Sequence, residues 1–193
     1  MNRNFPGDWA PENVNPGGGP TPMSEPEVRA VTDFWLSHPN IGGMVTYHTN
    51  GGIIVRAFDN KPDSDFIEKD LILFKTIGSM GTETIGDPCV SSFEELTRDK
   101  KKPRHGCTDS WTYLSRGIPG FCVELWDLAK HAGLGGFKER GGVYFRLDAL
   151  KEEDSLKTLQ WLDKELNGEG FVNWHPFKHP QLGDVEIGGW DMK

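Results

Sequence analysis

Apolar residues recur every three or four positions in three segments, at about residues 25–37, Asp65 to Gly86, and residues 155–166. This spacing places them on one face of a helix, so we predict three amphipathic helices packed against a core. The predicted core faces are Val28, Val31, Phe34 and Trp35 in the first helix, Ile67, Leu71, Phe74, Ile77 and Met80 in the second, and Leu156, Leu159, Leu162 and Leu166 in the third.

Three further segments are rich in strand-forming residues: Ile41–Tyr47, Ile53–Arg56 and Phe121–Trp126. Trp111–Tyr113 is expected to be a short helical or turn element. Helices that alternate with apolar strands favour an α/β fold, because parallel strands need connections of this length. We therefore predict a mixed, partly parallel sheet flanked by helices, with ligands beyond the carboxyl ends of the strands.

The segment before the first helix has loop composition, since residues 6–22 hold five prolines and four glycines. Ser24-Glu25-Pro26-Glu27 then has the form of a capping box. We expect the Ser24 side chain to accept from a backbone amide of the first turn, while Glu27 reaches back to the Ser24 amide.

The overall composition narrows the function classes. Acidic residues number 29 against 21 basic ones, giving a net charge of −8 and no basic stripe that would bind nucleic acid. No apolar stretch reaches the roughly 18 residues that span a bilayer, and the first residues lack a signal-peptide pattern. The three separated cysteines indicate neither a disulfide framework nor a cysteine-based zinc cluster, and Cys122 is expected to be a buried core thiol.

Four residues could carry chemistry. The Arg3 guanidinium, with Asn2 beside it, can bind a carboxylate through parallel hydrogen bonds; a solvated arginine is the alternative. His48 follows an apolar strand and precedes a glycine-rich turn, where it can bind a metal, or can be a core imidazole bonded to a carbonyl group. Glu124 lies in the apolar run Phe-Cys-Val-Glu-Leu-Trp, where desolvation would raise its pKa unless a structural partner neutralises it.

Taken in order, several motifs resemble the carboxyl-terminal half of a zinc carboxypeptidase of the carboxypeptidase A-like (M14) family. These motifs are Asn2-Arg3-Asn4-Phe5-Pro6, Gly18-Gly19-Pro20 with Ser24-Glu25-Pro26-Glu27, Tyr47-His48-Thr49-Asn50-Gly51-Gly52, Trp111-x-Tyr113, and Glu124-Leu125-Trp126. The resemblance covers residues 1–130. Residues 131–193 are expected to be the remainder of the same domain or a family-specific extension.

The resemblance implies a role for each candidate residue. Asn2 and Arg3 would hold the terminal carboxylate of a substrate. His48 would be a Zn²⁺ ligand, and Glu124 the general base. The family takes its other two ligands from an upstream His-x-x-Glu motif, which this sequence lacks. The chain is therefore expected to be a fragment that is inactive by itself.

Two departures from the family pattern concern the substrate pocket. The family commonly has a mobile Tyr upstream of its Asp-Trp motif, but no Tyr occurs between Tyr47 and Tyr113. Aligning Trp111 without gaps places Ser110 at the usual Asp and Asp109 at the base of the specificity pocket, where it could select substrates ending in Lys or Arg. With one inserted residue, Asp109 would instead be the usual structural Asp.

The expected function is that of a zinc-dependent metallocarboxypeptidase, a hydrolase acting on peptides or proteins with a free carboxyl terminus. One alternative is a zinc amide hydrolase acting on small N-acyl amino acids. Another is a non-catalytic module that binds carboxylates. The family resemblance suggests a secreted or periplasmic protein, although the sequence itself leaves the compartment open.

Overall fold

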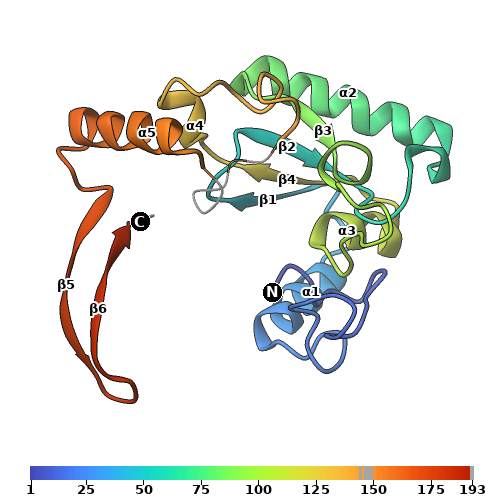
Figure 1. Cartoon of the computed structure of the whole chain (residues 1–193). Coiled ribbons are helices and arrows are strands. Elements are labelled where there is room, and N and C mark those ends of the chain that lie inside the picture. The colour runs from blue at the N-terminus through green and yellow to red at the C-terminus, as the bar shows by residue number, and fades with distance from the viewer. Residues whose placement is uncertain (144, 146–149, 192–193) are drawn as a thin grey trace.

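The computed structural model describes residues 1–143, 145 and 150–191. Its centre is a four-stranded sheet in the order β1-β4-β2-β3 (Figure 1). The strands are β1 (Met44–His48), β2 (Ile53–Arg56), β3 (Cys89–Ser91) and β4 (Gly120–Glu124). β1 pairs with β4 and β2 with β3 in parallel, whereas β2 and β4 are antiparallel. The predicted mixed, partly parallel sheet is confirmed.

Five α-helices surround this sheet within the described residues. They are α1 (Pro26–Ser37), α2 (Glu68–Ile85), α3 (Thr108–Arg116), α4 (Leu128–His131) and α5 (Glu152–Glu165). A 3₁₀ turn, η1 (Asp63–Asp65), and a π-helical turn, η2 (Ser92–Leu96), complete the helical elements. Figure 1 shows α2 lying along the sheet while α1 and α3 gather near the amino terminus.

Alternation along the strands gives the sheet two buried faces. Ile54, Phe121 and Val123 pack with Phe74 of α2 in one apolar cluster. Val55 and Cys122 belong to a second cluster on the other face. Cys122 is 4% exposed, in agreement with the expected core thiol. Glu124, two residues further along β4, points to the same face as Cys122.

The helices bury narrower faces than the sequence predicts. Phe74 and Leu162 are buried, at 1% and 4% exposure, but several predicted core residues are exposed. More than half of the side chain is exposed at Phe34, Ile67, Met80 and Leu156, and smaller but substantial fractions are exposed at Val31 and Leu166. The predicted core positions at these six residues are therefore wrong. Helical spacing gives the direction of an apolar face, whereas its buried width depends on which neighbours cover it.

Asn4 replaces the predicted capping box. The cap residue of α1 is Glu25, without a side-chain cap hydrogen bond. The fully buried Asn4 side chain accepts from the Glu25 amide at 3.1 Å and donates to the carbonyl groups of Gly18 and Thr21 and to Ser24 Oγ. Ser24 is thus drawn towards Asn4, and one amide group fixes both the proline-rich loop and the start of α1.

A hairpin formed by β5 (Phe171–His179) and β6 (Gly183–Trp190) projects away from the sheet, as Figure 1 shows. It follows α5, whose Leu162 packs with Leu128, Ala129 and Phe145. The sequence did not predict this hairpin. Among the described residues, no helix has both the length and the apolar character needed to cross a bilayer.

Candidate active site

One pocket brings together all five candidate residues: Asn2, Arg3, His48, Asp109 and Glu124. It is a cavity of about 80 Å³ on the face of the sheet where Glu124 projects. The other lining residues are Val55, Asp59, Ser92, Leu96, Arg104, Cys107 and Cys122. The site therefore forms from segments distributed over the first 124 residues.

His48 and Glu124 end their two strands side by side. They are register partners in the parallel β1–β4 ladder, and His48 Nδ1 lies 3.4 Å from Glu124 Oε1. Hydrogen bonding to Cys122, and then to Glu124, raises the pKa of His48 to about 10, although partial burial acts in the opposite direction. The neighbouring side chains thus favour the protonated, positively charged form of the His48 imidazole.

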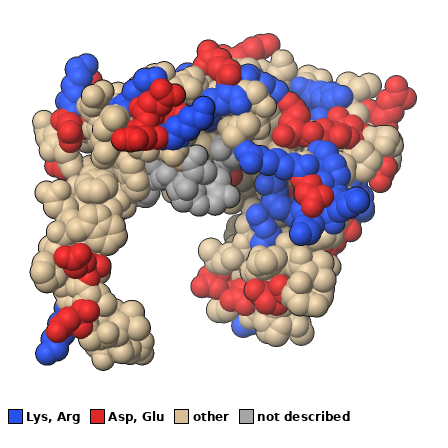
Figure 2. Space-filling view, viewed as in Figure 1, with Lys and Arg blue, Asp and Glu red and all other residues tan. Residues whose placement is uncertain are grey.

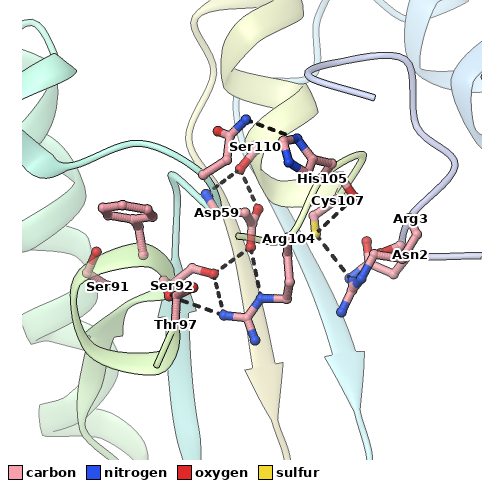
Figure 3. Close-up of polar contacts among 12 residues, drawn as sticks. Asn2, Arg3, Asp59, Ser91, Ser92, Thr97, Arg104, His105, Cys107 and Ser110 are labelled. Carbon is pink, nitrogen blue, oxygen red and sulfur yellow. Dashed lines mark hydrogen bonds and ion pairs between the residues drawn. The ribbon is translucent and has the colours of Figure 1, made fainter. Parts of the chain in front are cut away.

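Asn2 and Arg3 reach the pocket from the amino-terminal segment. Asn2 Oδ1 accepts from the backbone amide and the hydroxyl group of Thr108, both at 2.8 Å, so its amide nitrogen faces His48 Nε2 at 3.5 Å. Arg3 Nη1 donates to the Asn2 carbonyl group and to Cys107 Sγ (Figure 3). An arginine carries five N–H donors, and these two contacts involve a single guanidinium nitrogen.

A buried carboxylate network forms one wall of the pocket, and the sequence analysis missed it. Asp59 is 4% exposed and accepts hydrogen bonds from the hydroxyl groups of Ser92 and Ser110. Arg104 Nε lies 3.8 Å from Asp59, and Arg104 Nη2 donates to Ser92 Oγ at 2.8 Å (Figure 3). The position of Asp59 shortly after the buried strand β2 was the signal that could have identified it.

Asp109 lies in the first turn of α3, 2% exposed, and its Oδ2 is buried without a hydrogen-bond partner among the described residues. Burial, and then the negative charge of Asp59, raise the pKa of Asp109 well above its usual value. Ser110 turns away to Asp59 instead. Asp109 thus lines the pocket, whereas the Ser110 hydroxyl group is bonded to Asp59.

Figure 2 shows Lys and Arg side chains gathered on the loops beside α3, on a face that otherwise carries both signs of charge. The segment between η2 and α3 supplies Arg98, Lys100, Lys101, Lys102 and Arg104. Arg104 is the member of this set that lines the pocket.

Within the described residues, two groups of side chains could hold a metal ion: His48 with Cys122 and Glu124, and Asp59 with Cys107 and Asp109. In each group the possible ligand atoms lie within 4.8 Å of one another. Nitrogen, sulfur and carboxylate oxygen are the donors that Zn²⁺ takes in proteins, so the first group fits zinc. In the second group, Asp59 is already engaged by two hydroxyl groups and Arg104.

A family model described as zinc carboxypeptidase matches residues 1–138. The chain therefore belongs to the zinc carboxypeptidase family, whose members are peptide hydrolases and whose family name implies zinc. No match was found among curated proteins.

Solved structures show the same fold. Thrombin-activatable fibrinolysis inhibitor is 21% identical with a TM-score of 0.53, the match covering 88% of this chain and 42% of that one. The bovine form of that protein, solved with a tick carboxypeptidase inhibitor, is 21% identical with a TM-score of 0.52, over 86% of this chain and 56% of that one. Carboxypeptidase A from Helicoverpa armigera is 15% identical with a TM-score of 0.54, the match covering 87% of this chain and 41% of that one. The chain thus spans about half the length of these structures or less.

Proposed function

We propose that this chain supplies the substrate-binding and general-base part of a zinc-dependent metallocarboxypeptidase that removes carboxyl-terminal residues from peptides. The observation that carries the proposal is the convergence of Arg3, His48 and Glu124 on one pocket. These three residues offer a carboxylate receptor, a metal ligand and a base within one small site.

Each residue has a distinct task. Arg3 and Asn2 bind the free carboxylate of the substrate through charge-assisted hydrogen bonds, which confines cleavage to the last peptide bond. His48 would hold zinc, which when bound supplies Lewis acidity to a carbonyl group and lowers the pKa of a water molecule. Glu124, with 15% of its side chain exposed, takes a proton from the attacking water and delivers it to the departing amine.

The remaining family ligands come from outside these 193 residues, because the sequence holds no His-x-x-Glu motif. We therefore expect negligible peptidase activity from residues 1–193 alone, even with excess zinc. Rapid zinc-dependent hydrolysis by this chain would contradict that part of the proposal.

The decisive experiment is Glu124→Gln in the full-length protein that contains this chain. The amide keeps the shape of the side chain but is not a base, so kcat should fall at least about 100-fold while zinc content stays unchanged. Glu153→Gln, at an exposed position of α5, is the matched control. Full activity of the Glu124 variant would remove this residue from the mechanism.

A second candidate is hydrolysis of small N-acyl amino acids, which would offer the same free carboxylate to Asn2 and Arg3 in the pocket. Comparing kcat/KM for a tripeptide and for an N-acyl amino acid with the same terminal residue separates the two. A large preference for the N-acyl amino acid would favour this candidate.

A further inference from the structure

A second cavity, of about 340 Å³, lies next to the pocket of Arg3, and we call it the α5 cavity. It begins one residue beyond the candidate active site, because Thr49 follows His48 in the chain and Leu125 follows Glu124. Consecutive Cα atoms are about 3.8 Å apart, in a substrate as in the protein. A substrate with its terminal residue in the first pocket can therefore reach the α5 cavity with the group that comes before that residue.

The α5 cavity combines buried leucines with exposed apolar side chains. Leu128 and Leu162 are 2% and 4% exposed, whereas Leu125, Trp126 and Leu166 keep 47%, 43% and 39% of their surface in contact with solvent. The other lining residues are Thr49, Asn50, Gly170, Trp190 and Asp191. A mostly apolar cavity with a few polar groups is typical of a ligand site, and its exposed apolar surface favours an apolar occupant.

The carboxyl-terminal part of the chain builds one side of this cavity. Leu162, Leu166, Gly170, Trp190 and Asp191 all lie beyond residue 138, where the match to the family model ends. Figure 1 shows α5 at the end of the sheet towards which β1 and β4 run, the end where ligands of α/β folds gather. Residues outside the family match thus contribute to a cavity beside the candidate active site.

Trp126 is held in a strained backbone conformation beside the α5 cavity. Its φ of +56° lies in the left-handed region, which a bulky residue rarely adopts. Its carbonyl group accepts from the Gly51 amide at 2.8 Å, and its ring stacks on His131 with the ring centroids 5.1 Å apart and lies 5.8 Å from Trp161. Strain that is fixed in this way is concentrated at ligand sites, which supports a binding role for the Trp126 ring.

We propose that the α5 cavity binds an apolar group on the amino side of the bond that is cleaved. This group is the side chain of the penultimate residue of a peptide, or the acyl chain of an N-acyl amino acid. The proposal rests on the proposed function, in which Arg3 holds the carboxylate of the terminal residue. Because that carboxylate occupies the charged pocket, the apolar cavity is left for the preceding part of the substrate.

Binding to the full-length protein carrying Glu124→Gln tests the subsite without catalysis. We expect calorimetry to show N-hexanoyl-leucine binding at least about tenfold more tightly than N-acetyl-leucine, since each methylene group that is fully buried contributes about fourfold. Leu166→Asn, added to the same protein, should reduce this ratio at least about threefold, because it removes apolar surface from the cavity. Leu156→Asn, at an exposed position of α5 outside the cavity, is the matched control and should leave the ratio unchanged.

Peptides show whether a side chain also uses the subsite. With the catalytically competent full-length protein, kcat/KM for a tripeptide with a penultimate leucine should exceed that for the glycine analogue at least about tenfold. Leu166→Asn should lower this ratio and leave kcat/KM for the glycine analogue unchanged. A chain-length effect in the acyl series without a preference among peptides would assign the subsite to acyl chains.

Equal affinities for the two N-acyl leucines would overturn the subsite, as would equal effects of Leu166→Asn and Leu156→Asn on their ratio. Either result leaves the carboxypeptidase proposal standing if the full-length protein hydrolyses peptides. Conversely, a chain-length effect that depends on Leu166, in a protein that hydrolyses no peptide, would contradict the proposed function and support the apolar subsite.

Discussion

Gly106 packs directly against the backbone of Arg3. A Cβ atom at Gly106 would overlap the Arg3 carbonyl oxygen and lie 2.7 Å from its carbonyl carbon. Gly106 also has a φ of +62° and accepts a hydrogen bond from the Phe5 amide at 3.0 Å. The absence of a side chain at Gly106 therefore allows the amino-terminal segment to reach the pocket.

Gly106→Ala should destabilise the chain by about 2 to 4 kcal/mol, because it combines left-handed backbone strain with a clash against Arg3. Urea unfolding measures the effect. Gly117→Ala is the matched control, since Gly117 has a similar φ of +68° but open space around its Cβ position, and should cost only about 1 to 2 kcal/mol. Equal losses of unfolding free energy in the two variants would show that the clash with Arg3 does not contribute to the destabilisation.

Arg3→Lys should raise KM for peptide hydrolysis by the full-length protein at least about tenfold. A lysine keeps the charge but loses the two parallel hydrogen bonds that a guanidinium offers to a carboxylate. Steady-state kinetics with a substrate and its carboxyl-amidated analogue provide the measurement. Arg98→Lys, at an exposed position, should leave KM unchanged. An unchanged KM in the Arg3 variant would exclude Arg3 from carboxylate recognition.

Asp109→Asn tests specificity. If Asp109 selects basic side chains, kcat/KM for substrates ending in Lys should fall at least about tenfold relative to those ending in Leu, because a buried charge pair is lost. A parallel loss for both substrates would instead indicate a structural role. Ser110→Ala is the neighbouring control, since Ser110 bonds to Asp59 and should leave the ratio unchanged.

The Arg56–Asp63 pair predicts a pH dependence of stability. Arg56, at 6% exposure, donates two hydrogen bonds of 2.7 Å to Asp63. Burial would raise the pKa of Asp63, but hydrogen bonding and the charge of Arg56, together with Lys75, outweigh it and lower the pKa. The stabilisation is therefore present above the unfolded-state pKa of about 3.9 and is lost as pH falls through the lower folded-state pKa.

Asp63→Asn should accordingly reduce the free energy of unfolding by about 2 to 3 kcal/mol at neutral pH, less than the 3–5 kcal/mol of fully buried pairs because Asp63 retains partial exposure. Urea unfolding across a pH series should show this difference shrinking in acid. Asp65→Asn, an exposed neighbour, is the control. A difference that stays constant down to about pH 2 would refute the assignment.

The sequence predicts the parts of the site that depend on local pattern. His48 at a strand end and Glu124 within an apolar strand are both recognisable from a few neighbouring residues, and β2 has the predicted bounds. The predicted strand at residues 121–126 ends at Glu124 instead, and Leu125 and Trp126 are exposed.

The unpredicted parts depend on tertiary contacts. Asp59 contacts Ser92 and Ser110 only after the segments that carry them, next to β2, η2 and α3, have packed together. The spacing of these residues in the sequence therefore does not predict the network. The β5–β6 hairpin lacks a clear alternating pattern because Pro176 and the pair Gly188 and Gly189 interrupt its strands. β3 has three residues, too few for periodicity to define.

The hydrogen bonds of Asn4 connect the proline-rich loop to the wall of the pocket. Asn4 holds the loop through the carbonyl groups of Gly18 and Thr21, and it directly follows Arg3 in the chain. Substitutions in residues 16–24 should therefore shift the guanidinium and so change the carboxylate affinity that we propose for Arg3. Under the proposed function, selection or engineering could adjust binding there while Asn2 and Arg3 themselves are preserved.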